Sequence, residues 1–282
     1  PELWINPSDR ALCSATFACD GALLELWGPL LSGAAAAVVE VAKPSLEDIA
    51  HVMRRDQVTV TSFYAGMLNL MIDRQLDAFA TVRAVETGGD VMSLPHAAKL
   101  LDRFPDIALY NDYGPTETCN FSMSHRVTAA DIASGVISIG RGAVYEEPFL
   151  TETGELAIAG DGVALGYHNR AEETAKRFVA DPREGRTGLV YLTGDLAEID
   201  AQGVFWFKGR ADRQVKLAGH RVELDEVEHV LRACDGVEDA FVALRDATSG
   251  AKQMVGFYTG TASAAAVIDS AAKILPRETL PK

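Results

Sequence analysis

The sequence predicts an α/β protein with a large, mostly parallel sheet in its first part and a small α+β unit at its end. Over residues 11–110, short apolar runs alternate with amphipathic helical stretches, which is typical of βα units in a parallel sheet. From Glu155 onward the order of the expected elements changes: strands follow one another, and a hairpin signal lies between two of them. A chain of 282 residues can bury one large core and a small one. We therefore expect two domains, 1–209 and 210–282.

Periodicity, capping and turn residues predict the elements of the first part. The helix expected at 21–31 has one apolar face, which is made of Leu23, Leu24, Trp27, Leu30 and Leu31. Ser45 is the expected N-cap of the next helix, with Asp48 completing a shortened capping box. β-Branched residues predict a strand at 58–63. The other elements expected in this part are strands at 11–18, 34–41, 83–86 and 107–110 and helices at 64–76 and 95–104.

In the second part, strands are expected at 155–159 and 189–192, on either side of a helix at 171–178. The sequence Asp200-Ala201-Gln202-Gly203 predicts a hairpin turn between strands 196–199 and 204–207. The helix expected at 225–233 starts with carboxylates, which the helix dipole favours there. The remaining elements expected in the last unit are strands at 214–217, 221–223, 237–244 and 254–258 and a helix at 263–275.

Composition and charge exclude several classes of function. A hydrophobic content of 48% indicates a globular chain rather than a disordered one. The formal net charge of -14 argues against nucleic acid or an anionic membrane as the main partner. The sequence has no apolar run of membrane-spanning length and no signal pattern at its start. Scattered cysteines without a CxxC spacing indicate reduced thiols and a cytoplasmic protein; these are Cys13, Cys19, Cys119 and Cys234.

The most informative stretch is Asn111-Asp112-Tyr113-Gly114-Pro115-Thr116-Glu117. It follows the strand expected at 107–110, and Gly114-Pro115 turns the chain into a loop at the edge where open α/β sheets bind ligands. Tyr113 offers a ring that can stack on a base, and Thr116 offers a hydroxyl for a phosphate oxygen. Glu117 offers a carboxylate oxygen of the kind that Mg²⁺ takes. The alternative at this point is an ordinary polar turn.

This stretch resembles the YGPTE core of the adenylate-forming enzymes, in particular the amino-acid adenylation domains of nonribosomal peptide synthetases and their stand-alone relatives. Two later segments resemble further cores of that family, in the same order. One is Gly154-Glu155-Leu156 with Gly160 and Gly166-Tyr167; the other is Thr193-Gly194-Asp195-Leu196 with residues 209–216 and 221–224. The resemblance implies ATP-dependent activation of an amino acid as aminoacyl-AMP. Transfer to the phosphopantetheine thiol of a peptidyl or acyl carrier protein would follow.

The resemblance also implies which residues hold ATP and Mg²⁺. Tyr113 would stack on adenine, Asn111 would read the adenine edge, and Asp195 would accept hydrogen bonds from the ribose hydroxyls. Thr116, Glu117 and Arg210 would be catalytic, with Glu117 also binding Mg²⁺. The full nucleotide-binding set implied is Gly88, Gly89, Asp90, Asn111, Tyr113, Thr116, Asp195, Phe207 and Arg210. The alternatives are a turn aspartate after a strand for Asp195 and a surface charge for Arg210.

Asp20 carries the prediction of the substrate class. In the amino-acid branch of the family, an aspartate five residues before a glutamate pairs with the substrate ammonium, and Asp20 stands in that relation to Glu25. Cys19 replaces the usual aromatic neighbour, and the alternative for Asp20 is a helix N-cap. The pocket implied is Asp20, Gly21, Leu24, Ser62, Thr87, Gly89, Asp112, Asn120 and Phe121. Asp112 with Asn120 suggests a polar, cationic or β-amino substrate, unless Asp112 hydrogen-bonds its own loop.

Asp212 resembles the family's hinge residue, about which a small mobile C-terminal lid swings between adenylate and thioester formation. The partners implied are the carrier protein and either a small activator protein or neighbouring synthetase domains. One alternative is an acyl- or aryl-CoA ligase, which the loss of Asp20 from the pocket would favour. The other is a non-catalytic nucleotide-binding homologue.

Two features of the family have no match between Pro1 and Lys282: its Ser/Thr/Gly-rich phosphate loop and its late catalytic lysine. We therefore expect the later part of an adenylate-forming core, present as a fragment or with stretches removed. A shortened homologue is the alternative, and the same two features motivate the non-catalytic interpretation.

Overall fold

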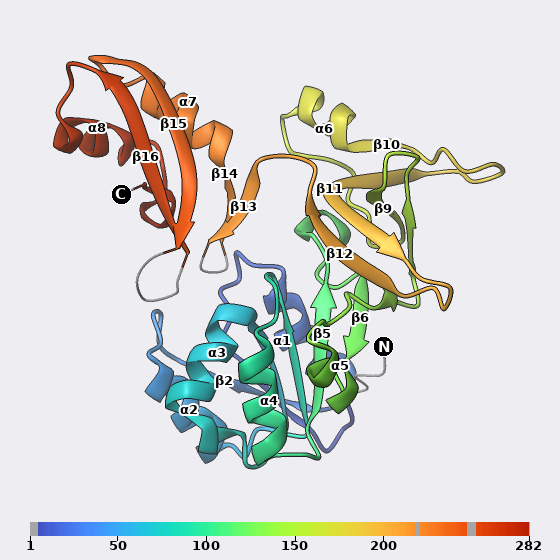
Figure 1. Cartoon of the computed structure of the whole chain (residues 1–282). Helices are drawn as coiled ribbons and strands as arrows, with labels where there is room; N and C mark the ends of the chain where they lie inside the picture. The colour runs from blue at the N-terminus through green and yellow to red at the C-terminus, as the bar shows by residue number, and fades with distance from the viewer. Residues whose placement is uncertain (1–4, 218–219, 247–251, 282) are drawn as a thin grey trace. The chain divides into compact units, whose positions relative to one another are not determined.

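The computed structural model describes residues 5–217, 220–246 and 252–281, which form two compact units, Pro1–Gly209 and Arg210–Lys282 (Figure 1). The first unit is built on a seven-stranded sheet of order β2-β1-β3-β4-β5-β6-β7. Neighbours among β1 to β5 pair in parallel, and β6 and β7 add antiparallel strands. The predicted mostly parallel sheet is therefore confirmed. The strands are β1 (Arg10–Cys13), β2 (Ala35–Val38), β3 (Val60–Tyr64), β4 (Ala84–Gly88), β5 (Ala108–Tyr113), β6 (Met123–Arg126) and β7 (Arg141–Gly142).

Three helices cover one face of this sheet, where Figure 1 draws α2, α3 and α4 side by side. Their inward side chains join those of the strands in one core that includes Leu12, Met53, Leu68, Val85 and Leu109. The capping box predicted before α2 is present: Asp48 N donates to Ser45 Oγ, and Ser45 N donates to Asp48 Oδ2. The helical segments of the unit's first part are α1 (Gly21–Leu31), α2 (Leu46–Arg55), α3 (Ala65–Arg74), η1 (Leu76–Phe79), α4 (Leu94–Arg103), η2 (Thr116–Thr118) and α5 (Ala129–Ser134).

Helix α1 has the predicted bounds, but its predicted apolar face is largely exposed. Trp27 is 52% exposed and Leu31 is 81% exposed, whereas Ala22, Glu25 and Pro29 are buried. The Glu25 carboxylate accepts hydrogen bonds from the backbone N–H groups of Ser14 and Ala15, at 2.6 and 2.7 Å. These bonds place the Glu25 side of the helix inward, because a buried carboxylate needs such donors.

A second sheet follows in the same unit, with order β10-β11-β9-β8 and with β12 pairing β11. Its elements are β8 (Glu146–Leu150), β9 (Glu155–Gly160), α6 (Ala171–Arg177), β10 (Phe178–Ala180), β11 (Leu189–Ile199) and β12 (Phe205–Arg210). The expectation of two strands at 189–192 and 196–199 was wrong, since both belong to β11. The pairing of β11 with β9 shifts register between Leu192 and Leu196, where Gly194 has φ +75. The Asp200 hairpin is confirmed: its carboxylate accepts from Gln202 N and Val204 N.

The second unit has a core of its own, which includes Val227, Leu231, Val242, Met254 and Val267. It consists of β13 (Gln214–Leu217), β14 (His220–Glu223), α7 (Leu224–Arg232), β15 (Val237–Asp246), β16 (Lys252–Gly260), α8 (Ala264–Ala271) and η3 (Arg277–Thr279). Both strand pairs are antiparallel. Within the described parts of both units, no helix is long and apolar enough to cross a bilayer.

Candidate active site

The carboxyl ends of β3, β4 and β5 lie next to one another at one edge of the first sheet. β5 runs on to Tyr113, so Asn111, Asp112 and Tyr113 are strand residues and their side chains alternate between the two faces. The register pairs Thr87 with Asn111 and Ser62 with Glu86. This edge therefore carries most of the polar residues that the sequence singled out.

Two glycines allow the close approaches that shape this edge. A Cβ on Gly88 would clash with the carbonyl oxygen of Asp112 and would lie 3.2 Å from Phe121 Cε1. A Cβ on Gly114 would clash with the carbonyl oxygen of Asn120, whose φ of +77 folds the loop back. The structure thus brings together four residues of the predicted sites: Gly88, Asp112, Asn120 and Phe121. Gly89, with φ +77, lies near Tyr64 instead, a half-exposed residue that sequence reasoning missed.

Tyr113 and Asp195 connect the two sheets of the first unit. The Tyr113 hydroxyl donates to Asp195 Oδ2, and both side chains are buried. Asp195 is a strand residue of β11 rather than a turn residue, and its N–H donates to Thr193 Oγ1. The Tyr113 ring belongs to an apolar cluster with Met123, Ile139, Leu156, Ile158, Ala197 and Phe205. The carboxylate proposed for the ribose is therefore held rigidly, with a phenol as one of its partners.

Asn111 and Asp90 each make a hydrogen bond at the same edge. The buried Asn111 amide donates through Nδ2 to the carbonyl oxygen of Ser138, at 2.8 Å. This bond fixes the orientation of the amide, while its predicted contact with adenine stays a prediction. Asp90 Oδ1 accepts from Val91 N at 2.7 Å.

The predicted Mg²⁺ ligand Glu117 has a tyrosine partner. Tyr167 Oη donates to Glu117 Oε1 at 2.6 Å and lies 3.3 Å from the Tyr191 hydroxyl. Burial and the bond to Glu117 raise the pKa of Tyr167, so the phenol stays protonated and keeps donating. No group of three acidic, histidine or cysteine side chains gathers as a metal site in the described parts of the chain. A single carboxylate fits Mg²⁺ bound mainly by phosphate oxygens and water.

Asp20 caps helix α1 in this structure. Its Oδ1 accepts from Gly21 N at 2.9 Å and from Cys19 Sγ at 3.4 Å. Gly21 and Leu24, two further predicted pocket residues, lie in the first turns of the same helix. The capping role considered as the alternative is therefore present, and the ammonium contact stays a prediction.

Arg210 and Asp212, at the start of the second unit, are paired with each other. Arg210 Nε and Nη2 donate to Asp212 Oδ1 and Oδ2 at 2.6 and 2.9 Å, a bidentate arrangement. Asp212 Oδ1 also accepts from Gln214 N. The predicted catalytic arginine and the predicted hinge residue thus form one ion pair.

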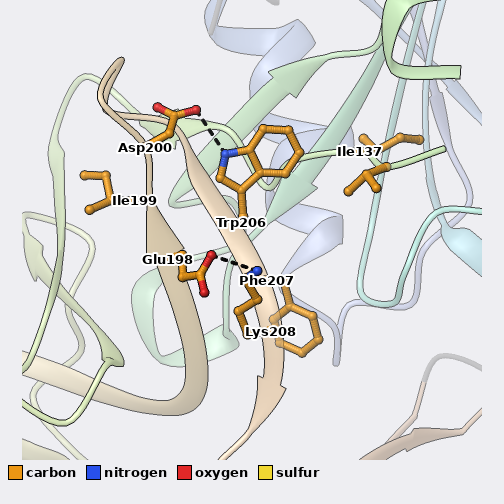
Figure 2. A pocket seen from close by; sticks show the side chains of 8 residues that line it. Ile137, Glu198, Ile199, Asp200, Trp206, Phe207 and Lys208 are labelled. Atoms are coloured by element: carbon orange, nitrogen blue, oxygen red, sulfur yellow. Dashed lines mark hydrogen bonds and ion pairs between the residues drawn. The ribbon is translucent and has the colours of Figure 1, made fainter. Parts of the chain in front are cut away.

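Phe207 lines a groove that includes none of the other predicted nucleotide-binding residues. This groove of about 330 Å³ lies between residues 136–137 and the β11–β12 hairpin (Figure 2). Figure 2 shows two polar links within the hairpin: Trp206 Nε1 donates to Asp200 at 3.0 Å, and Lys208 pairs with Glu198 at 2.7 Å.

Comparison with known proteins agrees with the family that the motifs indicate. Residues 1–168 match the family of AMP-binding enzymes. The chain belongs to this family. The fold comparison agrees, because PA1221, an NRPS protein containing adenylation and PCP domains, superposes with a TM-score of 0.86 and 33% identity, over 94% of this chain and 48% of that one. The predicted family and fold class are therefore confirmed.

Sequence relatives of this AMP-binding enzyme include synthases of linear gramicidin and of tyrocidine. One subunit of the linear gramicidin synthase of Brevibacillus parabrevis is 37% identical over 90% of this chain and 3% of its own length. Tyrocidine synthase 3 of Brevibacillus parabrevis is 32% identical over 98% of this chain and 4% of its own length. The chain therefore spans a small part of these relatives and about half of PA1221.

One residue of the AMP-binding enzyme was missed by sequence reasoning although it stands beside the predicted pocket. Glu86 is buried in β4, and burial together with the charge of Asp112 raises its pKa. Burial likewise raises the pKa of Asp112 to about 7, opposed by a hydrogen bond from Ser124. A charged residue inside the expected strand 83–86 was the available signal. Sequence alone does not say which neighbour faces it.

Proposed function

We propose that this chain activates an amino acid with ATP and passes it as a thioester to a carrier protein. The observation that carries the proposal is the group of polar residues at and beyond the end of β5, where Tyr113, Asp195 of β11 and Glu117 of η2 are each fixed by a specific hydrogen bond. The similarity to PA1221 supports it, since that NRPS protein contains adenylation and PCP domains.

In the first half-reaction, a carboxylate oxygen of the amino acid attacks the α-phosphorus of ATP and pyrophosphate leaves. Asp195 would accept hydrogen bonds from the ribose hydroxyls and keep the bond from the Tyr113 phenol. Thr116, which is exposed at the start of η2, would donate to an α-phosphate oxygen. Mg²⁺, held by Glu117 and phosphate oxygens, would supply positive charge at that phosphate.

In the second half-reaction, the phosphopantetheine thiol attacks the carbonyl carbon of the adenylate and AMP leaves. The residues at 210–212 would change conformation between the two steps, so that one active site meets two different reactants. The Arg210–Asp212 pair lies at this position and gives the proposed hinge a defined starting geometry.

The test is pyrophosphate exchange by the complete gene product across a panel of amino, β-amino, aryl and fatty acids. Asp20→Ala should abolish amino-acid-dependent exchange while the KM for ATP changes little, because the lost contact is to the acid. Asp20→Asn is the matched control, since it keeps the cap on α1 and removes only the charge. It should be as inactive as Asp20→Ala.

A wild type that prefers aryl or fatty acids, and that keeps its activity in Asp20→Ala, would contradict the proposal. That result would instead support an acyl- or aryl-CoA ligase. A protein that binds ATP but shows no exchange with any acid would support a non-catalytic homologue.

A further inference from the structure

We propose that Glu86 and Asp112 together form a two-carboxylate floor of the amino-acid pocket and select a substrate with a cationic side chain. The inference rests on the proposed function. It adds a residue with no assigned role, Glu86, and it names the charge of the substrate class.

Strand register places the two carboxylates on the same face of the sheet. Glu86 in β4 pairs with Tyr110 in β5, and Asp112 stands two residues beyond Tyr110. Because side chains two residues apart on a strand point to the same side, Glu86 and Asp112 share one face. Ser62 pairs with Glu86 and Ser124 pairs with Asp112, so hydroxyls flank the carboxylates on the neighbouring strands.

Both carboxylates are buried, and each keeps an oxygen without a partner. Glu86 is 7% exposed and Asp112 is 5% exposed. Glu86 Oε2 and Asp112 Oδ2 find no hydrogen-bond donor in the described parts of the chain. Uncompensated buried charge is costly, so two such groups side by side indicate a ligand that would complete them.

The charged side chains near Glu86 and Asp112 indicate that this ligand is a cation. Arg126 pairs with Tyr110 on β6 but is exposed, and no ion pair with Glu86 or Asp112 occurs among the described residues. Helix α1, which contacts β1, β2 and β3, presents only the acidic groups Asp20 and Glu25. Tyr110 and Ser124 are neutral donors at most.

The position of Glu86 and Asp112 beside the predicted sites indicates that they bind the substrate rather than a metal ion. Asp112 directly precedes Tyr113, and its carbonyl packs against Gly88 beside Phe121, both of which belong to the predicted sites. The described residues supply no third metal-ligating side chain to the pair. An ammonium or guanidinium can donate to both carboxylates at once, which favours a basic amino acid.

Protonation gives the floor a second observable property. Burial raises the pKa of both carboxyls in the free protein, and that of Asp112 to about 7. A bound cation stabilises the ionised forms, so binding should release protons into the buffer. The KM for a cationic substrate should fall as pH rises from about 6 to about 8, whereas that for a neutral substrate should not.

The experiment compares ornithine, lysine and arginine with norleucine and citrulline in pyrophosphate exchange by the complete gene product. We expect the wild type to favour a basic amino acid by about 100-fold or more in kcat/KM. Glu86→Gln and Asp112→Asn should each reduce that preference at least about tenfold while the KM for ATP stays constant. Calorimetry in buffers of different ionisation enthalpy should show proton release with the basic substrate in the wild type and none in the double variant.

Glu146→Gln is the matched control. Glu146 is a part-buried carboxylate in β8 with a pKa raised to about 7 by burial and with an unpartnered Oε2, but its Oε1 accepts from Gly162 N. This variant should leave the substrate preference unchanged.

The outcomes separate this inference from the proposed function. Exchange that depends on Asp20 but favours norleucine or citrulline would leave the function standing and overturn the carboxylate floor. Equal losses for basic and neutral substrates in Glu86→Gln would show a structural role only, which also overturns it. Absence of exchange with every amino acid would remove both.

Discussion

Tyr113 and Asp195, two predicted nucleotide-binding residues, are hydrogen-bonded to each other. The phenol of one donates to the carboxylate of the other, and both are buried between the two sheets of the first unit. A ribose diol must therefore share this acceptor with a neutral phenol. An ionised carboxylate can accept several hydrogen bonds, so the diol can be added without leaving the phenol unpaired.

We predict that Asp195→Ala raises the KM for ATP by about 10- to 100-fold, because hydrogen bonds to a bound diol are lost. The protein should lose about 1 kcal/mol of unfolding free energy with the acceptor of Tyr113. Tyr113→Phe separates the effects, since it removes the same hydrogen bond and keeps the carboxylate. Steady-state kinetics and urea unfolding measure both quantities, and unchanged ATP kinetics in folded Asp195→Ala would take this residue out of the site.

Asp112 and Glu86 give a prediction about stability against pH. The pKa of Asp112 is raised from 3.8 to about 7 in the folded protein, so its contribution to stability is fully present below pH 3.8 and is lost as pH rises through 7. Asp112→Asn should therefore gain stability over the wild type at pH 8, by up to about 4 kcal/mol at about 1.4 kcal/mol per pKa unit. Glu86→Gln should change stability in the same direction.

Urea unfolding at about pH 5 and about pH 8 measures this gain. A stability difference between Asp112→Asn and the wild type that is the same at both values would show that the carboxyl is not protonated in the folded protein. Bound basic amino acid should abolish the gain, because the cation then compensates the charge.

At the scale of elements, the β strands were predictable but their ends were not. Apolar residues predicted a strand at 107–110, whereas β5 continues through Asn111 and Asp112 to Tyr113. Polar residues interrupt the apolar pattern at the end of a buried strand, so the sequence signal stops before the hydrogen bonding does. The faces of Asp112 and Glu86 depend on that continuation and on the register with β4.

For helix α1 the sequence predicted the ends but not the side that is buried. Its bounds follow from the sequence, but periodicity identifies an apolar face without saying what covers it. The bonds from Ser14 and Ala15 to Glu25 decide which side faces inward, and they depend on tertiary placement.

Gly88 allows β4 and β5 to approach at their carboxyl ends, which leads to a prediction for this pair of strands. Gly88→Ala should cost about 1–3 kcal/mol of stability, because a Cβ there meets the backbone oxygen of Asp112 and cannot be relieved by a rotamer change. It should also lower kcat/KM for the amino acid, since Asp112 is displaced. Thermal unfolding and pyrophosphate exchange measure the two effects.

Gly154→Ala is the control for that substitution. Gly154 has φ +81 and nothing within 4 Å of an added Cβ, so only backbone strain of about 1 kcal/mol is expected. If Gly88→Ala resembled this control in both stability and substrate kinetics, the close approach would have no functional role.

At the scale of the whole molecule, the division into units follows from two separate cores. From the sequence we expected domains 1–209 and 210–282, although the change in the order of the expected elements begins at Glu155. The Arg210–Asp212 pair could not be anticipated, since both residues were assigned separate roles from motif positions. Because their side chains form two hydrogen bonds, a motion that separates Asp212 from Arg210 would remove one partner of Arg210.

The last prediction concerns the proposed hinge and uses the pairing of Arg210 with Asp212. Asp212→Pro restricts φ and removes the carboxylate that binds Arg210, whereas Asp212→Ala removes only the carboxylate. If backbone rotation at this residue separates two states, the proline variant should change the ratio of thioester formation to pyrophosphate exchange at least about tenfold relative to the alanine variant. Single-turnover assays of each half-reaction with the carrier protein measure this ratio. Equal ratios in two folded variants would assign the effect to the lost carboxylate and not to a hinge, because both variants lose the bonds of Asp212 to Arg210 and Gln214.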